Sequence, residues 1–158
     1  MGFDDLSDED ARALLLRCLS APAWAERVLS QRPYPSNDAL LASADGAARD
    51  LSDGDVEAAL AGHPRIGERA ASGHNAAASA REQSGVGGDA EIAERLAEGN
   101  RAYEACFGHV FLIRAAGRSG PEILAELERR LGNPPDVERG EMLDNLRQIA
   151  LLRLEKEV

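Results

Sequence analysis

Hydrophobic residues recur along this chain at the three- and four-residue spacing of an amphipathic α-helix. The first segment is typical: behind the capping residue Ser7 and three acids, apolar residues stand at positions 11, 14, 15, 18 and 19. Similar stripes begin near residues that favour helix starts, namely Pro22, Ser36, Ser52, Asp89, Ser119 and Asp136. We therefore predict an all-α fold, a single-domain helical bundle of about seven to nine helices that spans residues 1–158.

Two stretches interrupt the helical pattern. Residues 62–88 hold six glycines around a run of small residues, 76–83, and glycine at this density weakens regular structure. We expect an irregular, glycine-rich centre there, of the kind that places functional backbone. Residues 109–115 form an apolar run between Gly108 and Gly117. Periodicity alone leaves two interpretations of that run, a buried strand or a buried extended linker.

Charge and composition narrow the functional classes. Eighteen basic side chains against 28 acidic ones give a formal charge of −10, which disfavours nucleic acid as a partner. No apolar run approaches the length of a membrane span, and the acidic start of the chain does not resemble a signal peptide, so we expect a cytoplasmic protein. Cys18 and Cys106 lack CxxC spacing and are predicted to be buried free thiols. No ligand spacing indicates a metal site.

Candidate chemistry gathers in the glycine-rich centre. His63 stands between Gly62 and Pro64, and because proline restricts the residue before it, the imidazole should lie at an irregular helix end. If the following small-residue run is helical, Ser79, Glu82 and Gln83 share one face. A hydroxyl, a carboxylate and an amide suit a small polar heterocycle, with the carboxylate paired to a histidine. A structural histidine and a solvated helix face are the alternatives.

Four motifs, taken in order, resemble the family of 2-oxo-4-hydroxy-4-carboxy-5-ureidoimidazoline (OHCU) decarboxylases over nearly the whole chain. They are Gly62-His63-Pro64-Arg65-Ile66-Gly67, Ser79-Ala80-Arg81-Glu82-Gln83, Asn100-x-x-Tyr103-x-x-x-Phe107-Gly108, and Gly117-Arg118-Ser119. The resemblance implies an all-helical, commonly homodimeric enzyme that needs neither a metal nor an organic cofactor. Its small anionic substrate is OHCU, which it decarboxylates and protonates to give (S)-allantoin in urate catabolism.

The resemblance also implies roles for individual residues. His63 matches the family's proton donor, with Glu82 beside it. The expected substrate contacts are Pro64, Ser79, Ala80, Arg81, Glu82 and Gln83, followed by a pocket-lining segment that acts largely through its backbone, Phe111, Leu112, Ile113, Arg114 and Ala115. Arg118, at a predicted helix start, is our candidate for holding the substrate's anionic group.

The chain departs from the family pattern at two places. The interval between the histidine and glutamate motifs is a residue shorter than in animal members, which places the difference in the loop between them. Arg114 stands where other members often carry an uncharged residue. Two alternatives remain: a helical interaction module without catalysis, and a decarboxylase of another ureido acid. The presence of His63, Glu82, Ser79 and Gln83 favours an enzyme.

Overall fold

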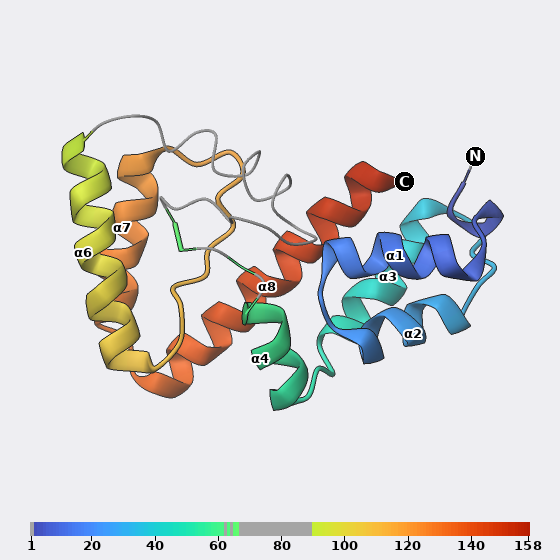
Figure 1. Cartoon of the computed structure of the whole chain (residues 1–158), viewed down its shortest axis with the longest axis horizontal. Helices are drawn as coiled ribbons and strands as arrows, with labels where there is room; N and C mark the ends of the chain where they lie inside the picture. Colours follow the sequence, from blue (N-terminus) through green and yellow to red (C-terminus); the bar gives the residue numbers. More distant parts are fainter. Residues whose placement is uncertain (1, 62, 64, 67–89) are drawn as a thin grey trace. The chain divides into compact units, whose positions relative to one another are not determined.

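The structure is a computed structural model that describes residues 2–61, 63, 65–66 and 90–158 (Figure 1). Within these ranges there is no strand, which confirms the predicted all-α class. A short 3₁₀ helix, η1 (Phe3–Asp5), precedes seven α-helices: α1 (Asp8–Cys18), α2 (Pro22–Ser30), α3 (Asn37–Ala48), α4 (Asp53–Ala61), α6 (Ala90–Phe107), α7 (Gly120–Leu131) and α8 (Pro135–Glu157). The chain divides into two compact units, Met1–Gly62 with Arg147–Val158, and His63–Leu146.

Serine side chains cap the helices at the predicted places. The hydroxyl oxygens of Ser7, Ser36 and Ser52 each accept a hydrogen bond of 3.1 Å from a backbone N–H of the first turn. Ser119 forms a reciprocal capping box with Glu122 at the start of α7. Each cap satisfies donors that the helix itself leaves unpaired, so the local sequence fixes where these helices begin.

α8 starts two residues earlier than predicted. Asp136 was expected to cap this helix, but Glu138 N–H donates to Pro134 O, and Pro135 is the first helical residue. Proline is well tolerated there because the first N–H groups of a helix have no intrahelical partner. Asp136 therefore lies within the first turn, where its charge still favours the helix dipole.

The first unit packs its helices around Trp24. The side chain is buried, and its indole N–H donates to Ala44 O at 3.0 Å, which satisfies the polar end of the ring and links α2 to α3. The predicted stripe of α1 is buried throughout, Cys18 included. From the end of α8, this unit receives Ile149, Ala150 and Leu154.

The second unit has a core formed by α6, α7 and the segment between them. Its buried members are Ile66, Leu96, Tyr103, Phe111, Ile113, Ala115, Ile123, Leu124 and Leu127. α6 and α7 approach closely at Gly99, where an added Cβ would lie 2.5 Å from Leu127 Cδ2. Residues 109–115 form neither helix nor strand, so the linker interpretation of that run is correct.

Two predictions of burial were wrong. Cys106 is exposed, because the inward face of α6 is made by Leu96, Asn100 and Tyr103, and Cys106 lies off that face. On α8, the apolar spacing after Asp136 predicts that Leu143 points inward, but Met142 is the fully buried residue there and Leu143 is only half-buried.

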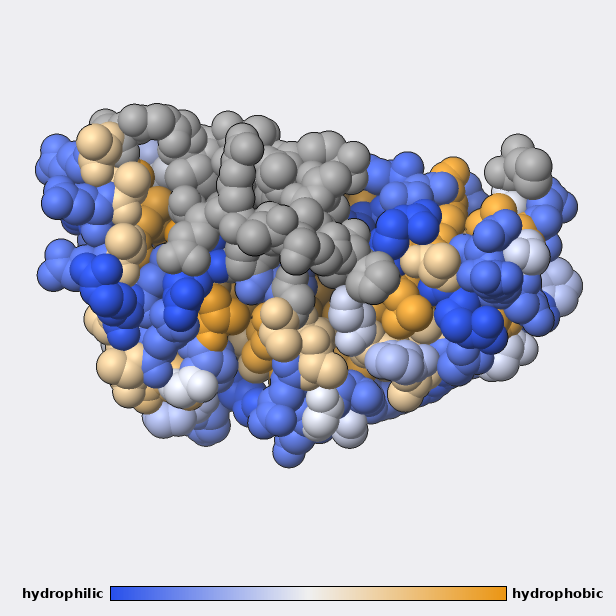
Figure 2. All heavy atoms as spheres, in the orientation of Figure 1, coloured by the Kyte–Doolittle hydropathy of each residue, from blue (hydrophilic) through white to orange (hydrophobic). Residues whose placement is uncertain are grey.

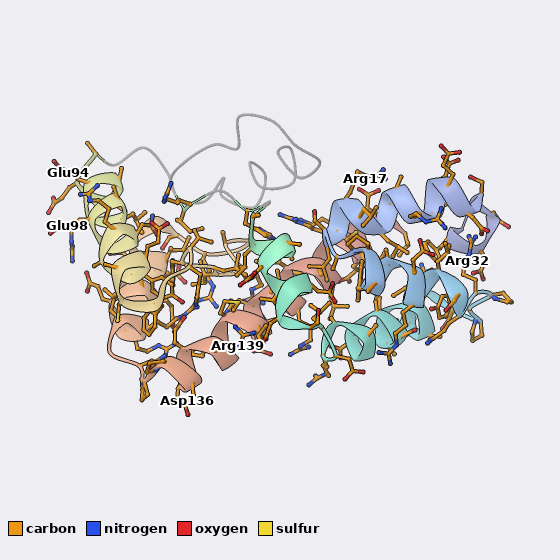
Figure 3. The ribbon with its side chains drawn as sticks, turned by 60° about the horizontal axis from the view of Figure 1, so that its bottom comes forward. Arg17, Arg32, Glu94, Glu98, Asp136 and Arg139 are labelled. Atoms are coloured by element: carbon orange, nitrogen blue, oxygen red, sulfur yellow. The ribbon has the colours of Figure 1, made fainter. Side chains whose placement is uncertain are left out.

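On the face drawn in Figure 2, hydrophilic side chains cover much of the described surface, with apolar side chains between them. Glu94 and Glu98 of α6 point away from the helix into solvent, as do Arg17, Asp136 and Arg139 on their helices (Figure 3). Among the described large hydrophobic residues, Val137 is the one that is exposed. No described helix is both long and apolar enough to cross a membrane.

Candidate active site

His63 lies just beyond the end of α4, in backbone that is not helical, as the proline that follows it in the sequence predicts. Its side chain is half-buried. The other members of the predicted catalytic and binding motifs lie outside the described residues: Pro64, Ser79, Ala80, Arg81, Glu82 and Gln83. The expected pairing of His63 with Glu82 therefore stays a prediction.

The chain immediately after His63 is attached to α6 by two side chains. Arg65 Nε donates to both carboxylate oxygens of Glu104, at 2.9 and 3.1 Å. Asn100, only 2% exposed, donates from Nδ2 to Ile66 O at 3.0 Å. These contacts fix the backbone within three residues of the histidine. The sequence signal for Asn100 was its place in the third family motif, although it was not predicted as a site residue.

A pocket of about 330 Å³ opens beside this attachment. Its lining comes from the loop and from one face of α6: Arg65, Ile66, Ala93, Ala97, Asn100, Arg101 and Glu104. None of the predicted substrate contacts is among these residues, so the pocket gives no support to the predicted binding set.

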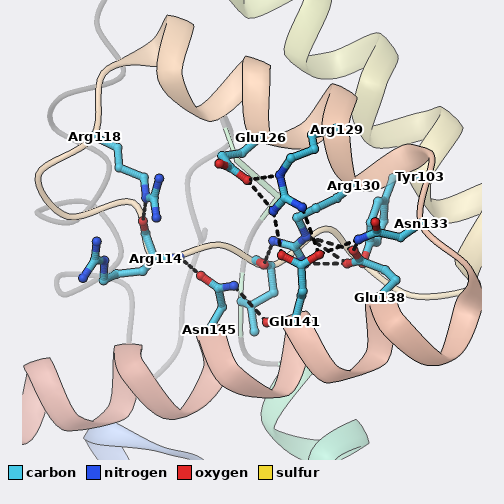
Figure 4. Close-up of polar contacts among 11 residues, drawn as sticks. Tyr103, Arg114, Arg118, Glu126, Arg129, Arg130, Asn133, Glu138, Glu141 and Asn145 are labelled. Carbon is cyan, nitrogen blue, oxygen red and sulfur yellow. Dashed lines mark hydrogen bonds and ion pairs between the residues drawn. The ribbon is translucent and has the colours of Figure 1, made fainter.

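The pocket-lining segment predicted from the resemblance lies in the core of the second unit. Phe111, Leu112, Ile113 and Ala115 are buried, and Arg114 is half-buried. Because this segment forms no helix or strand, its backbone depends on side chains from elsewhere for hydrogen bonds. Arg130 Nη1 of α7 donates to Leu112 O at 2.8 Å, and Arg114 N–H donates to Asn145 Oδ1 of α8 at 2.9 Å (Figure 4).

These two hydrogen bonds determine where the backbone groups of Ile113 point. In a trans peptide, the C=O and the N–H of one planar unit point in opposite directions. Since Leu112 O faces Arg130, the N–H of Ile113 faces away from Arg130. Since Arg114 N–H faces Asn145, the C=O of Ile113 faces away from Asn145. No described residue bonds to this N–H or C=O, so Ile113 keeps one backbone donor and one backbone acceptor that the described residues do not use.

Two arginines flank the end of this segment. Arg118 Nε donates to Arg114 O at 2.9 Å, so both arginine side chains lie at this end of the segment (Figure 4). Arg114 Nε is buried without a hydrogen-bond partner. Neither side chain forms an ion pair with a carboxylate in the described part of the chain. In a protein with ten more acids than bases, two neighbouring cations without carboxylates provide local charge for an anionic ligand.

The Arg130 side chain that holds Leu112 O is itself part of a buried ionic network. Arg130 and Glu138 are 1% and 0% exposed, and their closest N–O distance is 2.5 Å. The Tyr103 hydroxyl and Asn133 Nδ2 also donate to the Glu138 carboxylate. Burial first, and then this carboxylate, raises the pKa of Tyr103 well above its usual range. Tyr103 therefore remains a neutral hydrogen-bond donor to the Glu138 carboxylate.

At the edge of this network, Arg129 holds the pKa of the Glu141 carboxyl below its usual range through a direct hydrogen bond. Sequence analysis identified none of Arg130, Glu138 or Asn145. Within the described ranges, no group of His, Cys, Asp and Glu side chains is arranged to hold a metal ion.

Comparison with known proteins assigns the chain to a family. The family model for OHCU decarboxylase matches residues 4–155. A 2-oxo-4-hydroxy-4-carboxy-5-ureidoimidazoline decarboxylase from Haloferax volcanii is 32% identical over 85% of this chain and 80% of its own length. The corresponding protein from Amia calva is 33% identical, covering 85% and 79%. The uric acid degradation bifunctional protein TTL of Arabidopsis thaliana is 31% identical over 77% of this chain, which spans 39% of that longer protein.

Solved structures show the same relationship. A crystal structure of OHCU decarboxylase in the presence of (S)-allantoin superimposes with a TM-score of 0.78 and 26% identity, covering 96% of this chain and 97% of that one. An (S)-allantoin synthase, 18% identical with a TM-score of 0.72, shares the fold over 99% of this chain and 52% of its own. The extent of the family match and the identity to two full decarboxylases show that this chain belongs to the OHCU decarboxylase family.

Proposed function

We propose that this chain decarboxylates OHCU and protonates the product stereospecifically to (S)-allantoin. One observation carries the proposal beyond family membership. The unit that contains the anchored His63 loop also presents the unpaired N–H and C=O of Ile113, a donor and an acceptor suited to a ureide. The small anionic substrate has a proton donor and a polar recognition edge within one compact unit.

The chemistry requires little beyond these groups. The carboxylate of OHCU leaves as carbon dioxide when its C–C bond breaks, and the electron pair passes into the ring, next to an imine and a carbonyl that delocalise it. A proton must then be delivered to one face. We assign that step to His63, because a histidine beside a carboxylate such as Glu82 can carry a proton near neutral pH, and positioned proton transfer contributes about 10²–10⁴-fold.

The remaining roles follow from the same assignment. Pro64 and residues Ser79 to Gln83 contact the substrate around the histidine, and Phe111 to Ala115 also line the substrate site, which is distinct from the 330 Å³ pocket beside Arg65. Arg118 and Arg114 attract and hold the anionic group, which they can do because no described carboxylate neutralises them. We further propose that residues 1–158 act as one domain, that the enzyme works in the cytoplasm, and that it forms a homodimer.

Circular dichroism of the allantoin product tests this function. Urate is oxidised and hydrolysed in situ, and optically active allantoin is followed with no protein, with wild type, with His63→Ala and with His109→Gln. The His109 variant is the matched control, because that ring packs edge-on against Tyr103 and has no assigned chemical role. We expect wild type and His109→Gln to accelerate product formation, and His63→Ala to lose about 10²–10⁴-fold.

Each contrary result has a distinct meaning. No acceleration by wild type would refute the decarboxylase function. Activity that survives in His63→Ala would retain the function and refute the role given to the histidine.

A further inference from the structure

We propose that Asn145 of α8 is a positioning residue, which aims the Ile113 carbonyl at the ureide part of the substrate. The assignment rests on the proposed function and extends it to a residue outside the predicted binding set. Asn145 does not touch the substrate in this scheme. It acts by fixing the peptide unit between Ile113 and Arg114, whose N–H it binds at 2.9 Å.

The Asn145 side chain is itself fixed in orientation. Its Nδ2 donates to Glu141 O, one turn earlier on the same helix, at 2.8 Å. The amide group is thereby locked with Oδ1 toward Arg114 and Nδ2 toward its own helix (Figure 4). An asparagine held this way transfers the rigidity of α8 to a segment that has no helix or strand hydrogen bonds of its own.

The adjacent peptide unit is held from the opposite helix. Arg130 of α7 fixes Leu112 O and so directs the N–H of Ile113, as described above. The two anchors together orient both polar groups of one residue, whose side chain is buried in the core and unavailable for recognition. A backbone N–H and C=O on a single residue match the neighbouring C=O and N–H of a ureido group or cyclic amide. Ureides are therefore the ligand class that the backbone N–H and C=O of Ile113 select.

This geometry predicts an effect on binding rather than on proton transfer. The ureido group does not react, so a hydrogen bond to it contributes equally to the bound substrate and the transition state. Losing such uniform binding raises KM and leaves kcat unchanged. One misdirected hydrogen bond is equivalent to a change of about tenfold.

Two variants of Asn145 and one control separate positioning from stability. Asn145→Ala removes the acceptor for Arg114 N–H, whereas Asn145→Asp retains an acceptor oxygen at the same position. Ser36→Ala removes a helix cap in the other unit, which lowers stability without contact with this segment. Steady-state kinetics with OHCU generated in situ give KM and kcat, and hydrogen exchange monitored by NMR reports the protection of the Arg114 amide.

We expect Asn145→Ala to raise KM about tenfold, to leave kcat within about twofold, and to lose protection of the Arg114 amide. Asn145→Asp should keep that protection and a nearly normal KM, and Ser36→Ala should match wild type in both constants. An unchanged KM in Asn145→Ala, or an Asn145→Asp variant as impaired as Asn145→Ala, would overturn the positioning role alone. A wild type without OHCU turnover would overturn the proposed function, and this assignment with it.

Discussion

Replacing Arg130 by methionine should reduce the free energy of unfolding by about 3–5 kcal/mol, because it leaves a buried carboxylate without its cation. In the native structure the guanidinium donates to Glu138 from Nε and Nη2 and to Leu112 O from Nη1. After the substitution, Glu138 is still fully buried but retains only Tyr103 and Asn133 as donors. A loss of this size is a large part of the stability of about 5–15 kcal/mol that is usual for a domain.

The neighbouring Arg129 provides a matched control. It forms ion pairs with Glu126 and Glu141, but its side chain is 52% exposed. Solvent already screens these interactions, so Arg129→Met should cost no more than about 1 kcal/mol. Two adjacent arginines on one helix thus differ several-fold in their contribution, and burial is the difference between them.

Urea denaturation followed by far-ultraviolet circular dichroism measures both values. Replacing Glu138 by glutamine removes the buried charge that Arg130→Met leaves without a cation. The double variant Arg130→Met, Glu138→Gln should therefore lose less free energy of unfolding than the sum of the two single variants. Equal losses for Arg129→Met and Arg130→Met would refute the reasoning.

Three further predictions concern packing, titration and capping. Gly99→Ala should lower the melting temperature, because the new Cβ would lie 2.5 Å from Leu127 Cδ2. Gly140→Ala, with nothing within 4 Å of the new Cβ, should stabilise the protein by about 0.5–1 kcal/mol, and thermal melts that show the reverse order would contradict this packing. Burial raises the pKa of Tyr103, so as the pH rises the unfolded chain loses the phenol proton before the folded chain does. The free energy of unfolding should therefore fall above about pH 10, by up to about 1.4 kcal/mol per pH unit. In chemical denaturation, the free energy of unfolding of Tyr103→Phe should fall less steeply over the same pH range. Ser119→Ala should cost about 1 kcal/mol of unfolding free energy through loss of the capping box, and an unchanged denaturation midpoint would show that the box contributes nothing.

The helices could be predicted from the sequence because their determinants are local. Ser7, Ser36 and Ser119 each stand a fixed number of residues from the donors they cap, and apolar spacing identifies the buried faces. Errors arose where a local signal had two meanings. Asp136 is a good capping residue, but Pro135 before it is equally suited to begin a helix, and the type of Cys106 predicts burial although its position on α6 exposes it.

The residues that support the candidate site were missed for a different reason. Glu138 precedes Met142 by four residues and so shares the inward face of α8, but a carboxylate is normally assigned to solvent. Its burial becomes favourable only when Arg130 and Tyr103 arrive from other helices. Tertiary pairing of this kind has no signature in a single sequence, whereas His63 could be found because its neighbours form a contiguous motif.

The recognition groups proposed at Ile113 belong to the backbone, so the residues that determine this contact need not be the ones that line the site. The polar groups of Ile113 are the same in every residue type except proline, so for the proposed ureide contact the side chains of Phe111, Leu112 and Ile113 specify packing, and the anchors on α7 and α8 specify the direction of the N–H and C=O. Arg114 illustrates this separation, since its N–H is held by Asn145 whatever its side chain is. Conservative changes within the segment, such as Leu112→Met, should therefore leave KM near its wild-type value, although they alter residues predicted to line the pocket. Asn145→Ala, which changes no lining residue, should raise it. The determinants of this backbone contact then lie on the two helices that anchor the segment rather than within it.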